Sequence, residues 1–190
     1  MKKRRITGIS FNAPVVLTFC LLCVAAYIAG TLSGGRLTTL LFCVYRAPLT
    51  DPLTWVRCLG HVLGHASVDH LVNNLLYILL LGPMLEEKYG SANMALVILI
   101  TALVTGLVNM LLFPSAALLG ASGVVFAMIL LSSITRRENG KIPLTFVLVA
   151  FLYIGQQVLQ GLTANDISES AHITGGVVGS AMGFLLHREK

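Results

Sequence analysis

A serine and a histidine stand near the beginning of two separate apolar segments of this chain. Ser122 lies in the sequence Gly-Ala-Ser-Gly that begins at Gly120, and His172 opens a later apolar segment. Serine with histidine is the minimum apparatus for nucleophilic acyl transfer, because the imidazole can take the proton from the attacking hydroxyl. Ionisable groups inside membrane segments are rare and usually functional. The pair therefore predicts a catalytic site with Ser122 as nucleophile and His172 as general base and acid.

Each member of the pair also has an ordinary structural interpretation. A serine near a helix N-terminus presents free backbone N–H groups that can stabilise an oxyanion, but small polar residues also serve in packing between membrane helices. His172 could simply hydrogen-bond a neighbouring helix. Asp166 and Glu169 lie in the short loop just before His172. No carboxylate is therefore placed at depth to orient the ring, and a dyad is expected rather than a triad.

Other histidines and an asparagine extend the candidate site. His70 and Asn74 are four residues apart, so they share one face of a helix. Both can donate hydrogen bonds, which an oxyanion hole requires in addition to the Ser122 backbone N–H. An interhelical hydrogen bond is the alternative for Asn74. A metal site among His61, His65 and His70 is a further alternative, but the His-Glu-x-x-His pattern of a metalloprotease helix is absent. We expect neither a metal nor a cofactor.

The overall composition indicates an integral membrane protein. Of the 190 residues, 56% are hydrophobic and 11% are charged, and the mean hydropathy is +0.84. A soluble domain carries about 25% charged residues. We therefore predict one all-α membrane domain over residues 1–190, with a short cytoplasmic tail at 1–12 and a cytoplasmic end at 187–190. The net charge of +5 does not indicate a nucleic-acid partner, because the basic residues cluster between apolar segments.

Six segments are long and apolar enough to be buried in a bilayer. They lie at about 13–32, 70–86, 92–113, 120–135, 142–160 and 170–187. The first is longer than the apolar core of a signal peptide, about 7–15 residues, so we interpret it as a retained helix, with cleavage near the Ala25-Ala26 pair as the alternative.

A connector of about forty residues follows the first segment, and a loop that long usually has a function or structure of its own. Amphipathic interfacial pieces are expected in it. A disulfide between Cys43 and Cys58 in this connector is left open by the sequence.

The basic residues predict the orientation of these segments. Six spans would place both termini on the same side of the membrane. That side carries Lys2, Lys3, Arg4, Arg5, Lys88, Arg136, Arg137, Lys141, Arg188 and Lys190, and the other side carries Arg36, Arg46 and Arg57. The positive-inside rule then makes both termini cytoplasmic. The segments that begin near His70, Ser122 and His172 consequently all start on the external side.

The fourth segment is too short to span a bilayer. From Ser122 to Arg136 a helix would rise about 21 Å, whereas the hydrocarbon core is about 30 Å thick. The chain at 113–119 should therefore dip into the protein to meet it, which is tolerated only where the backbone is packed in protein or lines a wet cavity. We expect Ser122 about 10 Å below the outer boundary, in a water-filled pocket open to the outside.

Small residues recur every four positions on two of these segments. Ala171, Gly175, Gly179 and Gly183 form one such stripe, and Gly123 and Ala127 form another. Stripes of this kind let helix backbones approach closely. Contact between the two stripes would bring Ser122 and His172 within hydrogen-bond reach. Ordinary membrane packing is the alternative reading, and it is compatible with a catalytic one.

Three motifs occur together in a fixed order. They are His70-x-x-x-Asn74, Gly120-Ala121-Ser122-Gly123, and Ala171-His172-Ile173-Thr174-Gly175 followed by Gly179. In these motifs, each at the head of an expected helix, the chain resembles the rhomboid intramembrane serine proteases. The resemblance covers about residues 50–187.

The resemblance implies a rhomboid-like bundle of six transmembrane helices with a long first external loop and a short, recessed fourth helix. It implies a Ser122–His172 dyad and an oxyanion hole from His70, Asn74 and the Ser122 N–H. It also implies that the fifth segment, at 142–160, and the loops beside it gate substrate entry from lipid. Phe126 stands where the family often has a tyrosine that packs against the catalytic histidine. In the connector, Trp55-Val56-Arg57 carries one residue inside the family's Trp-Arg pair, and Glu86 matches a position that helps to hold the cytoplasmic end.

Our hypothesis is an intramembrane serine endopeptidase of the cell membrane, the plasma or inner membrane. It would cleave transmembrane or membrane-proximal segments of other membrane proteins near the outer face, with the bilayer itself as its other partner. A catalytically inactive protein of the same fold that binds membrane clients is the first alternative. A small transporter or channel subunit is the second, but such proteins often carry an intramembrane carboxylate or arginine. The sequence indicates no particular oligomeric state.

Overall fold

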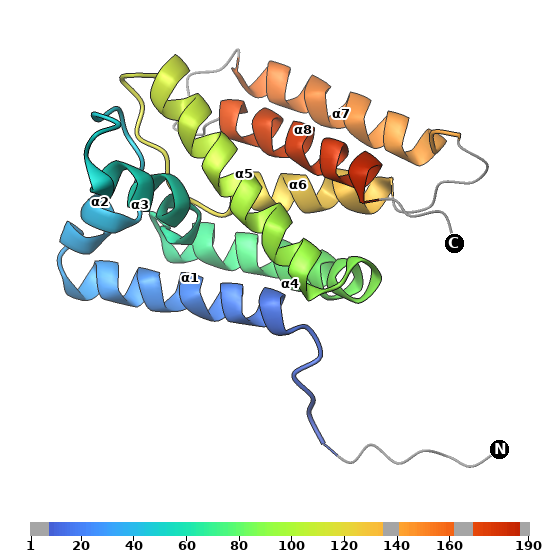
Figure 1. The fold of residues 1–190 in the computed structure, drawn as a ribbon, viewed down its shortest axis with the longest axis horizontal. Coiled ribbons are helices and arrows are strands. Elements are labelled where there is room, and N and C mark those ends of the chain that lie inside the picture. The colour runs from blue at the N-terminus through green and yellow to red at the C-terminus, as the bar shows by residue number, and fades with distance from the viewer. Residues whose placement is uncertain (1–7, 135–140, 162–168, 187–190) are drawn as a thin grey trace.

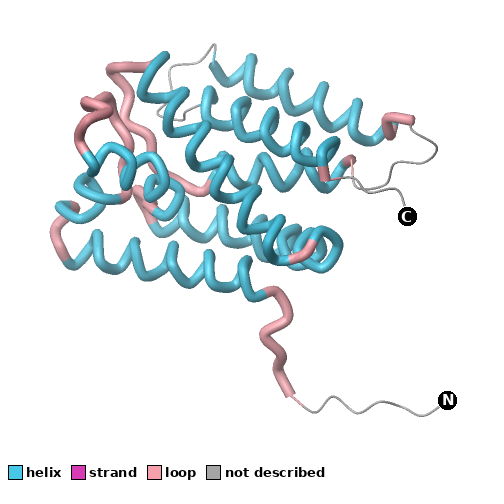
Figure 2. The backbone as a smooth tube through the Cα atoms, viewed as in Figure 1, coloured by secondary structure: helices cyan, strands magenta, loops and turns pink. Residues whose placement is uncertain are grey.

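The computed structural model describes residues 8–134, 141–161 and 169–186. The described residues form helices and no β-strand (Figures 1 and 2). In chain order the elements are α1 (Pro14–Leu32), α2 (Arg36–Leu41), α3 (Pro52–Gly60), η1 (His61–Leu63), α4 (Val68–Tyr89), α5 (Ser91–Leu112), α6 (Ser122–Ser133), α7 (Leu144–Gly161) and α8 (Glu169–Leu185). Residues 1–7, Asp166 and the end at 187–190 lie outside the described residues.

Each of the six predicted apolar segments corresponds to one helix of at least 12 residues. Three of these helices, α1, α4 and α5, are long and apolar enough to cross a membrane, with 19, 22 and 22 residues. At 1.5 Å per residue they measure about 28 to 33 Å, which matches a hydrocarbon core of about 30 Å. α6 is shorter, as predicted, and α7 and α8 complete the set. The all-helical membrane architecture is therefore confirmed, and the count of six spans stays a prediction.

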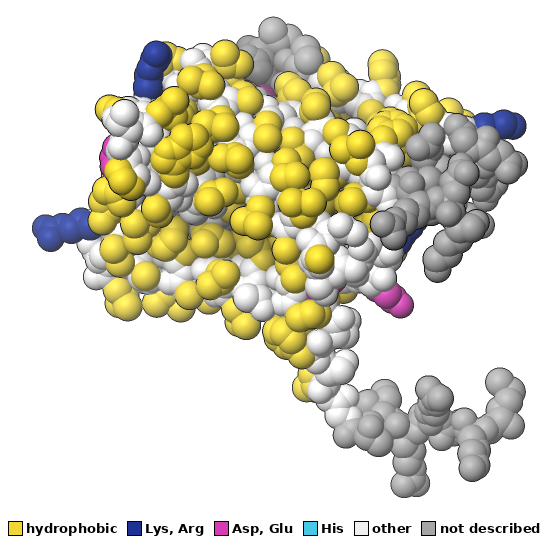
Figure 3. Space-filling view, viewed as in Figure 1, with side chains coloured by type: hydrophobic (Ala, Val, Ile, Leu, Met, Phe, Trp, Pro, Cys, Tyr) yellow, Lys and Arg dark blue, Asp and Glu magenta, His cyan; other side chains and the backbone are white. Residues whose placement is uncertain are grey.

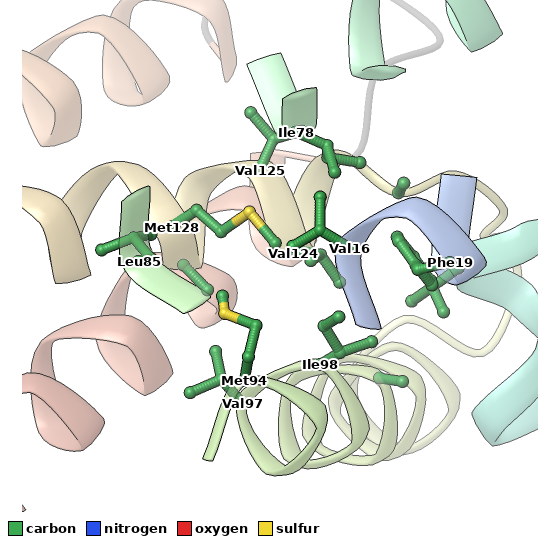
Figure 4. Close-up of a cluster of buried hydrophobic side chains, with 14 of the residues drawn as sticks. Val16, Phe19, Ile78, Leu85, Met94, Val97, Ile98, Val124, Val125 and Met128 are labelled. Atoms are coloured by element: carbon green, nitrogen blue, oxygen red, sulfur yellow. The ribbon is translucent and has the colours of Figure 1, made fainter. Parts of the chain in front are cut away.

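The helices enclose a core that α1, α4, α5 and α6 share. Figure 4 shows these buried side chains pointing toward one another from the four helices, and the largest include Val16, Ile78, Leu85, Met94, Val124 and Met128. Lipid tails are as apolar as these side chains, so in a bilayer close packing holds such helices together more than the removal of apolar surface from water.

The outer surface suits a lipid environment. On the face drawn in Figure 3, hydrophobic side chains are spread across the surface, and charged side chains lie at its edges. Exposed large apolar side chains occur on α1, α4, α5 and α7, among them Leu21, Ile28, Leu80, Leu99 and Phe151. On a soluble protein, so many exposed apolar side chains on neighbouring helices would favour aggregation. In a membrane they face the acyl chains.

Glu86, near the end of α4, fastens the start of α1. Its buried carboxylate accepts hydrogen bonds from the backbone N–H groups of Val15 at 3.0 Å and Val16 at 2.9 Å. The first turn of a helix has no internal partners for these N–H groups. The Ser91 hydroxyl donates to the same carboxylate at 2.6 Å. One side chain thus ties together the start of α1, the end of α4 and the start of α5.

The connector between α1 and α4 has structure of its own, as its length predicted. It contains α2, α3 and η1. The Arg57 side chain is buried, donates to the Leu40 carbonyl at 3.2 Å, and lies 3.6 Å from the Asp51 carboxylate. Cys43 and Cys58 are both buried free thiols. The disulfide that the sequence left open is therefore not formed.

The segment between α5 and α6 differs in detail from the prediction. Residues 113–117 lie at the surface, and burial begins only at Leu118. Backbone bonds of 2.8 and 2.9 Å join Leu118 to Val44, and the Gly120 N–H donates to the His61 carbonyl at 2.9 Å. The connector thus supplies the hydrogen-bond partners that a buried irregular backbone needs.

The helix α6 also begins two residues later than the predicted segment at 120–135. Gly120 has a φ of +127°, which is outside the helical region and favours glycine, and Ala121 is the N-cap. Ser122 is therefore the first residue of the helix.

Candidate catalytic site

Ser122 is half-buried at the N-terminus of α6, and His65 helps to fix the turn that leads to it. The Ala121 N–H points at His65 Nε2, 3.5 Å away, and His65 Nδ1 lies 3.1 Å from the Leu63 carbonyl. Burial, with a smaller contribution from His70 beside it, lowers the pKa of His65 to about 4. The ring is therefore neutral at physiological pH, with its proton on Nδ1 and its Nε2 free to accept.

The helices α6 and α8 pack with their backbones in contact. A β-carbon at Gly175 would collide with the Gly123 carbonyl, and one at Gly179 would collide with the Ala127 carbonyl. The structure thus brings the two predicted stripes of small residues together. Ser122 is the neighbour of Gly123, so the helix that carries His172 touches α6 at the level of the serine.

His172 is buried and is held from two directions. Its Nδ1 lies 2.8 Å from Oε1 of Gln157 on α7. An amide oxygen can only accept a hydrogen bond, so Nδ1 carries the proton and Nε2 remains available as a base. The Phe126 ring lies 4.4 Å from the imidazole, centroid to centroid, and Tyr153 lies 4.5 Å from Phe126.

Within the described residues, the Ser122 hydroxyl makes no hydrogen bond to His172. Both residues lie where α6 and α8 touch. Catalytic hydrogen bonds are often long in an enzyme without substrate and shorten when substrate binds. In this structure the helices that carry Ser122 and His172 are in contact, and the two side chains are not hydrogen-bonded to each other.

His70 lies against the loop that precedes Ser122. A β-carbon at Gly120 would stand 2.6 Å from Cε1 and 2.7 Å from Nε2 of the His70 ring. Because Gly120 has no β-carbon, the His70 imidazole can lie directly against the backbone of the turn. The His70 backbone N–H is itself fixed by a 3.1 Å bond to the Ser67 side chain, which caps α4.

Asn74 lies one turn further along α4 and is buried. Its Nδ2 has no hydrogen-bond partner among the described residues. A buried donor without a partner is unusual and calls for an explanation, such as a ligand that binds there. The adjacent Asn73 is exposed.

The remaining histidines do not assemble a metal site in the part of the chain that the structure describes. No group of three His, Cys, Asp or Glu side chains there is placed to hold a metal ion. The ring nitrogens of His61 lie 3.0 Å from the Cys58 carbonyl and 3.2 Å from the Thr105 hydroxyl. This histidine links η1 to α5.

Sequence reasoning missed Tyr153 and Gln157 on α7. Both are buried, and both approach His172, Tyr153 through Phe126 and Gln157 directly. A polar side chain inside an apolar segment is a signal for Gln157. The exposed Gln156 beside it carries the same signal, so the sequence does not tell which glutamine faces inward.

Comparison with known proteins adds an independent finding. The family model of the Rhomboid domain matches residues 52–189. The rhomboid protease GlpG of Haemophilus influenzae is 27% identical over 174 residues, which cover 90% of this chain and 90% of that protein.

Two further relatives are longer than this chain. The rhomboid protease GlpG of Salmonella paratyphi A is 29% identical over 176 residues, covering 90% of this chain and 63% of that protein. Rhomboid-like protein 11, chloroplastic, of Arabidopsis thaliana is 25% identical over 149 residues, covering 70% of this chain and 53% of that protein. The chain therefore spans about half to two thirds of the length of these two proteins.

Proposed function

The chain belongs to the rhomboid family, and from this premise we propose that it is an intramembrane serine endopeptidase. Family membership and the three long apolar helices make the chain an integral membrane protein. Two of the relatives named above are called proteases, which supports proteolysis as the reaction of this chain. The nucleophile and the base that such a reaction needs are Ser122 and His172.

The packing of α8 on α6 is the observation that carries the proposal. Because Gly175 meets Gly123, the helix of the base and the helix of the nucleophile touch beside Ser122. His172 presents Nε2 as its unprotonated nitrogen, since Nδ1 donates to Gln157. An imidazole in this state can accept the serine proton as the hydroxyl attacks.

The reaction proceeds through an acyl-enzyme. Ser122 Oγ bonds to the scissile carbonyl carbon while its proton passes to His172 Nε2. The tetrahedral intermediate collapses, the C–N bond breaks, and the imidazolium gives its proton to the leaving amine. Water then attacks the ester with His172 again as base, and the carboxyl product leaves with Ser122 restored.

The oxyanion of the intermediate needs hydrogen-bond donors, and we assign three residues to this role. They are the His70 imidazole, the Asn74 side-chain amide and the Ser122 backbone N–H. The unpartnered Asn74 Nδ2 supports this assignment, because a developing negative charge would satisfy it. The Ser122 N–H belongs to the first turn of α6, where backbone donors have no partner within the helix.

The substrates we propose are transmembrane or membrane-proximal segments of other membrane proteins. In this proposal the chain crosses the cell membrane six times, both termini are cytoplasmic, and the site opens toward the external side. The distribution of basic residues supports this orientation. A helical substrate has to unwind at the scissile bond, because an intact helix engages its own carbonyls.

The test is cleavage of a model transmembrane substrate in liposomes. Ser122→Ala should abolish cleavage and also labelling by a fluorophosphonate probe, because both require the hydroxyl. Ser133→Ala is the matched control, since Ser133 lies on the same helix with its hydroxyl bonded to the Leu130 carbonyl at 2.7 Å. Undiminished cleavage by the Ser122 variant would refute the proposal, and a client-binding protein without activity would not react with the probe.

A further inference from the structure

We propose that Gln157 is a positioning residue that holds His172 in the tautomer required of a general base. This inference rests on the proposed function for its catalytic meaning, but the hydrogen bond itself can be tested without any substrate. Gln157 would take the part that a carboxylate plays in a triad, with an uncharged amide in its place.

The geometry of the contact carries the argument. Gln157 is 2% exposed and His172 is 9% exposed, and Oε1 lies 2.8 Å from Nδ1. At this distance and burial the bond is shielded from competing water. Because the amide oxygen has no proton to give, the imidazole must place its proton on Nδ1 to make this bond.

The ring cannot easily turn away from Gln157. Phe126 packs against the imidazole at 4.4 Å between centroids, and Tyr153 backs Phe126 at 4.5 Å. Tyr153 is itself pressed on α8, since a β-carbon at Gly176 would stand 2.8 Å from its Cε1. The aromatic pair limits the tilt of the imidazole, and Gln157 sets which ring nitrogen carries the proton.

An amide is the suitable orienting group at this position. An ionised carboxylate buried among apolar helices is costly, and it would raise the basicity of the imidazole as well as orient it. Glutamine accepts the Nδ1–H bond without introducing charge. It also comes from α7, which packs on both α6 and α8 (Figure 1). The imidazole of His172 on α8 is therefore contacted from α7 by Gln157 and from α6 by Phe126.

The first experiment reads the tautomer directly in the wild-type protein. Nitrogen-15 shifts of the imidazoles are recorded in detergent micelles at neutral pH, and the His172 signals are identified by their loss in His172→Gln. We expect a proton on Nδ1 and an unprotonated Nε2. A proton on Nε2 in the wild-type protein would overturn the proposal, whatever the protein's activity.

The second experiment removes the acceptor. Gln157→Met keeps the length of the side chain and should lower kcat by about fivefold to tenfold, the fold-change for one ordinary hydrogen bond, with KM unchanged. The His172 spectrum should shift toward a mixture of tautomers. Gln156→Met, on the exposed position next to it, should change neither quantity.

Two outcomes separate the failure of this inference from the failure of the proposed function. If wild-type cleavage depends on Ser122 while Gln157→Met matches Gln156→Met in kcat and in spectrum, only the role of Gln157 is wrong. If no Ser122-dependent cleavage occurs, the proposed function fails, and the spectra still decide whether Gln157 fixes the tautomer.

Discussion

The side-chain amide of Asn74 is buried, and its nitrogen has no hydrogen-bond partner among the described residues. Leaving such a donor unsatisfied costs about 1–3 kcal/mol of stability. The cost is understandable if the donor is kept for a charge that exists only during the reaction. An interaction made only in the transition state raises kcat, whereas one made equally with the substrate lowers KM.

Asn74→Ala should therefore lower kcat by about a hundredfold and leave KM nearly unchanged, as expected when one oxyanion donor is removed. Steady-state cleavage of a transmembrane substrate measures both constants. The matched control is Asn73→Ala, since Asn73 is exposed on the same helix and should cleave at the wild-type rate. Equal losses in the two variants would contradict the assignment of Asn74 to the oxyanion hole.

The pairs Asn73–Asn74 and Gln156–Gln157 show where sequence reasoning about this site stops. In each pair the residue types are identical, and one member is exposed while the other is buried. The spacing from His70 favours Asn74, because residues four apart share a helix face. For Gln157 the sequence offers no functional residue on α7 whose spacing would select it, because the helix is mostly apolar. The orienting partner of His172 therefore became visible only in three dimensions.

Helix packing determines whether Ser122 and His172, the proposed nucleophile and base, can meet. The contact of α6 with α8 is made by backbone and by small side chains, and there is no space at Gly175 for even one more carbon. The spacing of small residues predicted this contact. By contrast, the exact start of α6 depends on the positive φ of Gly120. A glycine in the sequence permits that conformation but does not require it.

Gly175→Ala should abolish or strongly reduce cleavage and lower the free energy of unfolding by about 1–3 kcal/mol, because the added methyl group forces α8 away from Gly123. Thermal unfolding in detergent and the cleavage assay measure the two effects. Gly155→Ala on α7 is the control, because a β-carbon there meets nothing within 4 Å. If both variants unfold at the wild-type temperature, the close approach of α6 and α8 does not limit stability.

At the scale of the whole molecule, buried neutral histidines make stability depend on pH. Burial lowers the pKa of both His61 and His65 from 6.5 to about 4. Below pH 6.5 the unfolded chain binds protons at these positions, and the folded protein does not until about pH 4. Lowering the pH through this window therefore favours unfolding.

We expect the melting temperature in detergent to fall as the pH is lowered from 7 toward 5. Each of the two histidines contributes up to about 1.4 kcal/mol per pH unit to the loss. His61→Gln removes one of these titrating groups, so its melting temperature should fall less steeply over the same range. A variant whose slope equals that of the wild-type protein would show that His61 is not buried in its neutral form.

The pair of backbone hydrogen bonds between Leu118 and Val44 matters when a shorter fragment of this protein is designed. Both bonds join peptide groups, so no particular side chain in the sequence indicates that they are present. Val44 also lies ahead of residue 52, where the recognised domain begins. An excised fragment starting at that boundary would keep every motif and still lose an anchor of the turn that presents the serine.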